Sequence, residues 1–380
     1  MVTTRLLLSL ALLAGMAQAQ RHKFDLNTST PEGQLLQQAA QSTDDATKIK
    51  LYSEFVEKNP KHPATAWVYD QLVPLYLKAG DYDKTIAGAE AALALDPANP
   101  VIAYQALQAS EQKKDYEGVK KWSATTADAA QKVLAQKKPD DEDEVEAWKR
   151  EVDYSQQVIK RTEYSLYAGV LQATDPKVQV GLYEELERRN PKSEYLAQGA
   201  GQYFLALRQS GQEDKAFQVA EKTLASDQSN EDMLVVAASR YMDPKTKDPA
   251  KSLAYATKLV ELMNTKPAPE GVAAADWDKK KTSLIGLGYW IQGMNYGTQN
   301  NWAQADKAFR AALPHIQGNN ELLAPAYFYL GLSNYRMAEG PKGNKALLAE
   351  ARKFNQACAA IKGPYQAQAQ KNLTAMGAGK

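Results

Sequence analysis

Disulfide bonds are excluded within this chain, because its 380 residues include a single cysteine, Cys358. Stability must therefore come from the packing of side chains. Alanines surround this cysteine on a stretch with helical character, at positions 357, 359 and 360. Two interpretations stay open, a small buried hydrophobe and a reactive or dimer-forming thiol.

Histidine is also scarce, with only His22, His62 and His315 in the chain. None has another histidine four residues away, and none belongs to a cluster of metal-ligand residues. The sequence has no G-x-S-x-G turn, no phosphate-binding glycine loop and no paired cysteine and histidine. We therefore predict that the protein is not an enzyme and binds no metal and no cofactor.

An excess of either charge is missing, since Lys and Arg total 46 and Asp and Glu total 45. A nucleic-acid partner needs a basic excess that neutralises phosphates, so we predict no such partner. A net charge near zero gives no general attraction to a membrane surface either. The composition leaves proteins, peptides and small molecules as candidate ligands.

Long apolar runs are absent as well. The run from Leu6 to Gly15 is too short to cross a bilayer, which needs roughly 17 residues or more. Arg5 precedes it and the small residues of Ala17–Ala19 follow, an arrangement that resembles a secretory signal peptide cleaved before Gln20. We expect residues 1–19 to be removed, and the mature chain to be periplasmic or secreted, with no membrane span.

The stretch from Tyr69 to Pro97 has the pattern of a helical hairpin. Gly80 and Asp81 separate two runs of residues with helical spacing, and Pro97 ends the second run. The first run has its large apolar residues at Tyr69, Leu72, Val73 and Tyr76, and the second has small residues at Thr85, Ala89 and Ala92. Small residues are expected where two helices approach closely.

The same turn recurs along the chain, because Asp81-Tyr82 is followed 34 residues later by Asp115-Tyr116. A second strong unit has Tyr289, Gly293 and Tyr296 before its turn and Ala305, Phe309 and Ala312 after it. This pattern resembles the tetratricopeptide repeat, which has a period of about 34 residues. The resemblance implies an all-α, right-handed solenoid of seven or eight helical hairpins, closed by a C-terminal capping helix.

Five segments follow from these signals. They are the signal peptide (1–19), a flexible arm (20–31), an N-terminal block of repeats (32–136), an acidic linker (137–146) and a C-terminal block of repeats with the capping helix (147–380). Residues 51–61 are echoed at residues 182–192, an offset of 131 residues, which suggests that a block of repeats was duplicated.

The resemblance also implies where a partner binds. In the repeat family, the first helix of each hairpin lines a concave groove. Carried onto this sequence, the groove residues are Trp67, Asp70, Lys78, Tyr104, Gln108, Arg208, Trp290, Met294, Phe328, Tyr335 and Arg336. Aromatic residues and arginine are the types that anchor protein interfaces.

We therefore expect a non-catalytic scaffold or adaptor that binds a protein or peptide in the cell envelope or outside the cell. One alternative is a carrier of a small ligand such as an oligosaccharide or lipid, with sugar stacking around Trp290, Tyr296 and Trp302. Another is an architectural spacer that associates with itself into a homo-oligomer.

Overall fold

The computed structural model describes residues 22, 24, 26–339 and 344–378. The predicted signal peptide at residues 1–19 lies outside this part of the chain. The described residues form α-helices joined by short turns, with one 3₁₀ helix and no strands. They divide into two compact units, up to Ser210 and from Gly211 onward.

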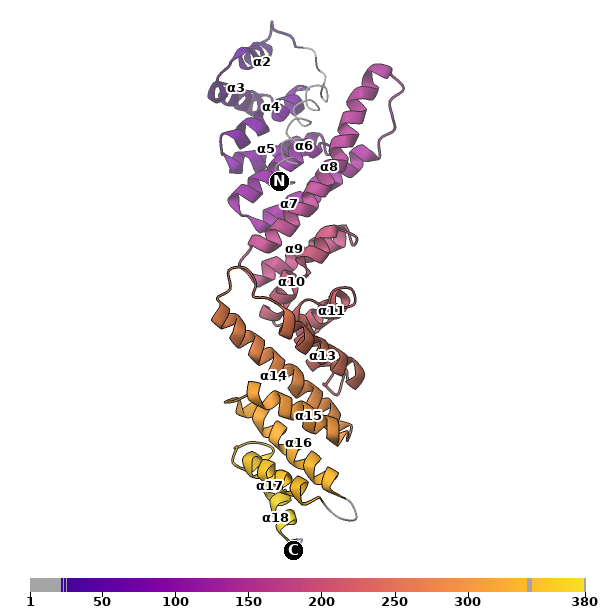
Figure 1. The fold of residues 1–380 in the computed structure, drawn as a ribbon. Coiled ribbons are helices and arrows are strands. Elements are labelled where there is room, and N and C mark those ends of the chain that lie inside the picture. Colours follow the sequence, from indigo (N-terminus) through magenta and orange to yellow (C-terminus); the bar gives the residue numbers. More distant parts are fainter. Residues whose placement is uncertain (1–21, 23, 25, 340–343, 379–380) are drawn as a thin grey trace. The chain divides into compact units, whose positions relative to one another are not determined.

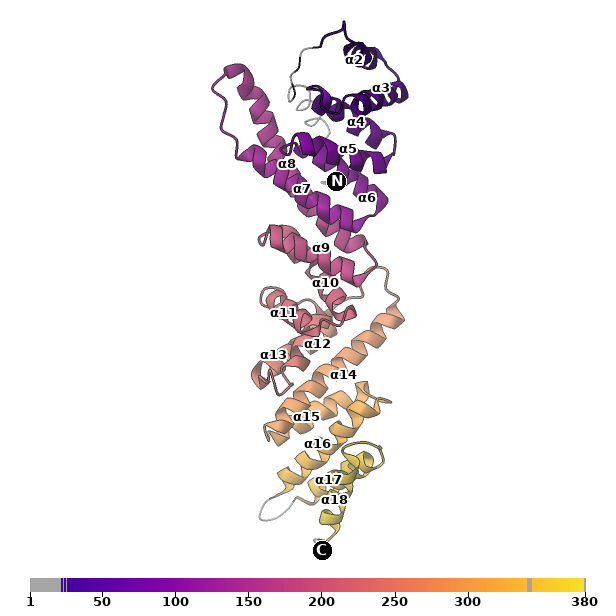
Figure 2. The same ribbon diagram turned by 180° about the vertical axis from the view of Figure 1, so that it is seen from behind.

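The first unit contains four helical hairpins followed by a single helix (Figures 1 and 2). Its helices are α2 (Pro31–Gln41), α3 (Asp45–Lys58), α4 (Thr65–Lys78), α5 (Tyr82–Leu95), α6 (Pro100–Lys113), α7 (Tyr116–Leu134), α8 (Glu142–Gln172), α9 (Pro176–Arg189) and α10 (Glu194–Gln209). The predicted acidic linker, 137–146, lies inside this unit, and α8 already begins within it.

The second unit contains one helix, three hairpins and a final helix. Its helices are α11 (Glu213–Leu224), α12 (Glu231–Arg240), α13 (Pro249–Thr265), α14 (Ala274–Thr298), α15 (Trp302–Ala312), the 3₁₀ helix η2 (Leu313–His315), α16 (Asn320–Ala338), α17 (Lys345–Ala359) and α18 (Gln366–Ala378). The prediction of an all-α array of hairpins that ends in a further helix is confirmed.

Asp and Asn residues start most of the helices. The side chains of Asp81, Asn99 and Asp115 each accept a hydrogen bond from a backbone N–H of the first helical turn. Such caps satisfy donors that have no partner inside the helix. Where such a cap is present, neighbouring residues in the chain determine where the helix starts.

The recurring turn has one geometry at several positions. The residue before the cap is left-handed, with φ 75° at Gly80, 54° at Lys114 and 60° at Asn300. The next N–H then bonds back to the helix, at 3.0 Å from Asp81 to the Tyr76 carbonyl and at 3.0 Å from Asp115 to the Ser110 carbonyl. This arrangement reverses the chain in two residues. The 34-residue spacing read from the sequence thus corresponds to one repeated turn.

Small residues lie where paired helices touch. A Cβ atom on Gly293 of α14 would lie 2.8 Å from the ring of Phe309 on α15. Phe309 is fully buried, so its ring fills the space that the glycine leaves. This contact explains why the repeat pattern places glycine opposite an aromatic residue.

Candidate functional site

The first helices of successive hairpins form a row in the first unit. Helices α4 and α6 contact each other, as do α6 and α8, and the single helix α10 contacts α8. Helices α7 and α9, which are second helices of their hairpins, contact each other as well. The unit therefore has a first-helix side, where the predicted groove residues lie, and a second-helix side.

Two side chains of the N-terminal arm lie against α4. The Nε2 atom of His22 is 3.5 Å from Oδ2 of Asp70 and 3.5 Å from Oδ2 of Asp96. The ring of Phe24 lies 5.3 Å from the ring of Trp67, centroid to centroid, at a tilt of 57°. We call Trp67, Asp70 and Asp96 the arm site. The sequence predicted a flexible arm here, and it gave no indication of these contacts.

The two carboxylates of the arm site are held in place by the turn between α5 and α6. Asp70 is 1% exposed, and its Oδ1 atom accepts a hydrogen bond of 2.9 Å from the side-chain amide of Asn99. Asn99 also caps α6, since its Oδ1 accepts from the N–H of Ile102 at 3.2 Å. Asp96 caps the end of α5 and accepts from the N–H of Ala98 at 3.1 Å. Burying a carboxylate is costly unless it is hydrogen-bonded, and Asn99 supplies such a bond to Asp70.

Trp67 is also fixed by its surroundings. Its ring meets the ring of Tyr52 on α3 edge to face, at 6.0 Å and 82°. Both belong to the apolar core of the first two hairpins, where Tyr52 is 4% exposed and Trp67 is half-buried. One part of the indole therefore packs inward, while Phe24 packs against another part.

Farther along the first-helix side, Tyr104 is covered. It is 5% exposed, and the guanidinium of Arg161 on α8 lies over its ring. Burial raises the pKa of Tyr104, although Arg161 acts in the opposite direction. The hydroxyl of Tyr104 is thus held neutral and the ring does not reach the surface.

Arg161 joins several aromatic residues that the sequence did not assign to the site. It is 7% exposed and forms an ion pair of 3.0 Å with Glu111 and a hydrogen bond of 2.7 Å to Ser165. Its guanidinium carbon is 5.0 Å from the ring centroid of Tyr164. Tyr195 then contacts both Tyr164 and Tyr167, at 5.8 and 5.3 Å between ring centroids. The spacing of Arg161, Tyr164 and Tyr167 on one helical face was the available signal.

The remaining predicted residues of the first unit are spread apart. Lys78 is at the end of α4, where its exposed ammonium pairs with Asp45 at 2.5 Å. Gln108 on α6 is half-buried, and Arg208 on α10 is exposed, 6.0 Å from the ring of Phe204. The structure therefore brings together only Trp67 and Asp70 among the six predicted residues of this unit.

In the second unit, three predicted residues contribute to packing. The indole N–H of Trp290 donates a 2.9 Å hydrogen bond to the carbonyl of Leu322, and Met294 packs against the same core. The ring of Phe328 lies 5.1 Å from that of Tyr365. A half-buried indole with its N–H engaged gives little support to the sugar-stacking alternative.

The other two predicted residues line a small pocket between α16, α17 and α18. Its volume is about 180 Å³, and its lining residues are Gly331, Leu332, Tyr335, Arg336, Asn355, Asn372, Ala375 and Met376. Arg336 is half exposed and paired with Glu339 at 3.1 Å. The pocket is large enough for one side chain, and its arginine already has an acidic neighbour.

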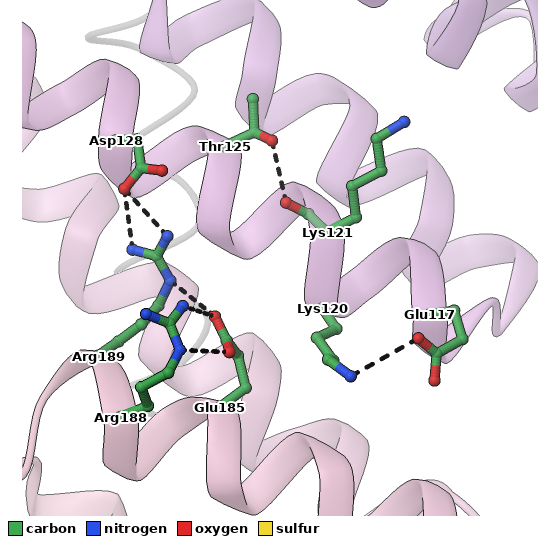
Figure 3. A network of polar contacts seen from close by, with 8 residues as sticks. All are labelled: Glu117, Lys120, Lys121, Thr125, Asp128, Glu185, Arg188 and Arg189. Carbon is green, nitrogen blue, oxygen red and sulfur yellow. Dashed lines mark hydrogen bonds and ion pairs between the residues drawn. The ribbon is translucent and has the colours of Figure 1, made fainter.

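The second-helix side of the first unit is a network of charges, which Figure 3 shows from close by. Arg189 on α9 contacts Asp128 on α7 at 3.0 Å and Glu185 at 3.1 Å. Arg188 pairs with the same Glu185 at 2.6 Å. Burial alone would raise the pKa of Glu185, but the two arginines outweigh it and lower that pKa. The charges of Asp128, Glu185, Arg188 and Arg189 therefore pair with one another, and none of these residues belongs to the arm site.

In the described part of the chain, no group of three or more His, Cys, Asp or Glu side chains is arranged to hold a metal ion. None of the helices described is both long and apolar enough to cross a membrane.

Comparisons with known proteins give no family by sequence, since no family profile and no curated protein match. Among solved structures, the chain is similar to YrrB, described as a TPR protein with an unusual peptide-binding site, at 15% identity and TM-score 0.28, over 57% of this chain and 93% of that one. A tetratricopeptide-repeat protein from Parabacteroides merdae has 12% identity and TM-score 0.26, over 84% and 98%. The TPR domain of P58(IPK) has 10% identity and TM-score 0.25, over 92% and 98%. The fold assignment stands on the hairpins themselves, and such low TM-scores carry no conclusion about ligands.

Proposed function

We propose that this array of helical hairpins of the tetratricopeptide-repeat type is a non-catalytic scaffold that binds protein or peptide segments on its first-helix side. One observation carries the proposal. The side chains of two residues of the N-terminal arm lie against α4, with His22 beside Asp70 and Phe24 beside Trp67. This surface can therefore hold side chains that come from outside the helical hairpins.

The chemistry of this surface supports a binding role. An aromatic ring fixed by packing and carboxylates fixed by hydrogen bonds lose little conformational freedom when a ligand arrives. Tryptophan is among the residues that contribute most to binding energy at protein interfaces. Trp67 and Asp70 are both held in place, because Trp67 packs on Tyr52 and Asp70 accepts a hydrogen bond from Asn99.

The proposal includes a place of action in the cell envelope or outside the cell. Its support is the sequence of residues 1–19, with Arg5 ahead of a short apolar run and Ala17–Ala19 after it. An adaptor for envelope or secretion machinery fits this address and a repeat scaffold.

The test is a selection of peptides from a random display library on the purified mature chain, followed by calorimetric titration of the selected peptides. We expect selected peptides to lose at least tenfold in affinity with Trp67→Ala. A matched control is Trp302→Ala, which removes a half-buried tryptophan from α15 in the second unit and should leave affinity unchanged. Circular dichroism would verify that both variants keep their helices. If no peptide depends on Trp67, the proposed surface is wrong.

A further inference from the structure

The arm contacts two carboxylates and one indole with side chains that are two positions apart. The side chains of His22 and Phe24 both lie against the first two hairpins. The imidazole of His22 therefore lies beside Asp70, and the phenyl ring of Phe24 lies beside Trp67.

We propose that the arm site recognises segments in which a cationic side chain precedes an aromatic one by two residues, and that His22 and Phe24 occupy it as an intramolecular ligand. A partner segment of this chemistry must then displace the arm before it binds. This inference rests on the proposed function and adds to it the class of ligand and a built-in competitor.

The charge of the site selects the cation. Oδ2 of Asp70 and Oδ2 of Asp96 both lie 3.5 Å from the same nitrogen of His22. Two carboxylates that converge on one point repel each other unless a positive group lies between them. The imidazole of His22 supplies such a group when it is protonated, and a lysine ammonium or an arginine guanidinium would supply it in a partner. Because Asp70 is 1% exposed, the attraction is screened by water less than at the open surface.

The apolar half of the site selects the ring. Phe24 packs on Trp67 at a tilt of 57°, and Trp67 packs edge to face on Tyr52. Tilted aromatic pairs of this kind are stabilised beyond the area that they bury, because the positive edge of one ring meets the negative face of the other. Phe24 also packs against the core of the first two hairpins, so an aromatic side chain at this position gains more than a small one.

The arm is joined to the site by a short connection. Helix α2 begins at Pro31, and Thr30 caps it by accepting a hydrogen bond from the N–H of Gly33. Thr30 also donates to the carbonyl of Asn27 at 3.0 Å, and Ser29 donates to the side chain of Asn27. A ligand on a short tether has an effective concentration on the order of millimolar. The arm therefore competes well with a free segment that makes the same contacts.

The arm lowers the apparent affinity of the site for a partner segment. If the arm fills the site for roughly 90–99% of the time, the apparent affinity for a partner falls about 10- to 100-fold. Substituting the two contact residues of the arm should remove this penalty, with no change in the site itself.

The experiment uses a labelled synthetic peptide with the sequence of residues 20–30, QRHKFDLNTST, added to the purified mature chain. We expect it to bind the His22→Ala/Phe24→Ala variant at least tenfold more tightly than the unsubstituted chain, by fluorescence anisotropy. Leu26→Ala is the matched control, because Leu26 belongs to the same arm and its side chain is 44% exposed. This control should bind the peptide as weakly as the unsubstituted chain does.

Two further measurements test whether the tighter binding occurs at the arm site. Adding Trp67→Ala or Asp96→Asn to the double variant should abolish the increase in peptide affinity. A peptide with alanine in place of its histidine and phenylalanine should not bind. Equal binding to the unsubstituted chain and to the double variant would overturn the inference, as would binding that ignores Trp67 and Asp96. Library peptides that depend on Trp67 but not on the arm substitutions would leave the proposed function intact while refuting this inference.

Discussion

The guanidinium carbon of Arg161 on α8 lies 5.9 Å from the ring centroid of Tyr104 on α6. This contact covers a side chain that the repeat pattern assigns to the ligand-facing side. It also closes the joint between two successive hairpins, because Arg161 pairs with Glu111 at the far end of α6. The surface available to a partner is therefore set by a residue from the next hairpin along the chain.

The first prediction concerns this arginine. Arg161→Ala should lower the free energy of unfolding by roughly 3 kcal/mol, because it removes one partner of a largely buried ion pair and uncovers Tyr104 and Tyr164. Urea denaturation followed by circular dichroism measures the change. Arg188→Ala is the control, since Arg188 is 66% exposed and water screens its ion pair, so this substitution should change the free energy of unfolding much less. Equal effects of the two substitutions would contradict the argument.

The second prediction concerns pH and Glu231, at the start of α12. This residue is 7% exposed, and burial alone would raise its pKa, but hydrogen bonds from Lys266 and Lys280 outweigh burial and bring the pKa to about 2. The folded-state pKa is thus depressed, so the stabilisation is full above the ordinary value of 4.5 and is lost as the pH falls toward 2.

The whole contribution of Glu231 is about 3 kcal/mol, of which about 2 kcal/mol should be lost between roughly pH 7 and pH 3. The measurement compares urea midpoints of the unsubstituted chain and of Glu231→Gln at both pH values. The difference in urea midpoint between the two proteins should be smaller at the acidic pH than at neutral pH. Glu339→Gln, which removes an exposed carboxylate, should show a small gap at both values.

The third prediction decides between the two interpretations of the single cysteine. Cys358 is fully buried, its Sγ lies 3.4 Å from the carbonyl of Ala324, and burial raises its pKa to about 11. Only the thiolate reacts readily, so a maleimide should not label the folded chain at neutral pH. Mass spectrometry should show one label per chain after unfolding in urea. Rapid labelling of the folded chain would favour the reactive thiol instead.

The fourth prediction concerns the close approach of α14 and α15. Gly293→Ala should destabilise the second unit by about 1–3 kcal/mol, because the added methyl group overlaps the buried ring of Phe309. A helix otherwise favours alanine over glycine by about 1 kcal/mol. Gly377→Ala provides that comparison, since a Cβ there meets nothing within 4 Å. The midpoint temperature of thermal unfolding should fall for Gly293→Ala, and it should stay equal or rise for Gly377→Ala.

Local signals explain what could be predicted from the sequence. The turns at Gly80-Asp81 and Lys114-Asp115 follow from a left-handed residue and a cap, and both depend on neighbours in the chain. The C-terminal helix that the resemblance to the repeat family implies is α18, which runs from Gln366 to Ala378.

The site could be predicted only in part, because its contacts join distant residues. Trp67 and Asp70 follow from their positions in the repeat. Arg161 lies over Tyr104 across 57 positions of sequence, and His22 meets Asp96 across 74 positions. Neither pairing produces a periodic pattern, since each depends on how one hairpin or one arm packs on another.

The hydrogen bond from Asn99 to Asp70 links the first residue of one hairpin to the middle of the preceding one. Asn99 also caps the start of α6. The position of the Asp70 carboxylate therefore depends on the spacing of the two hairpins. We expect that stretching the contact between these two hairpins would move the carboxylate of Asp70, and that a ligand bound to this carboxylate would stiffen the contact.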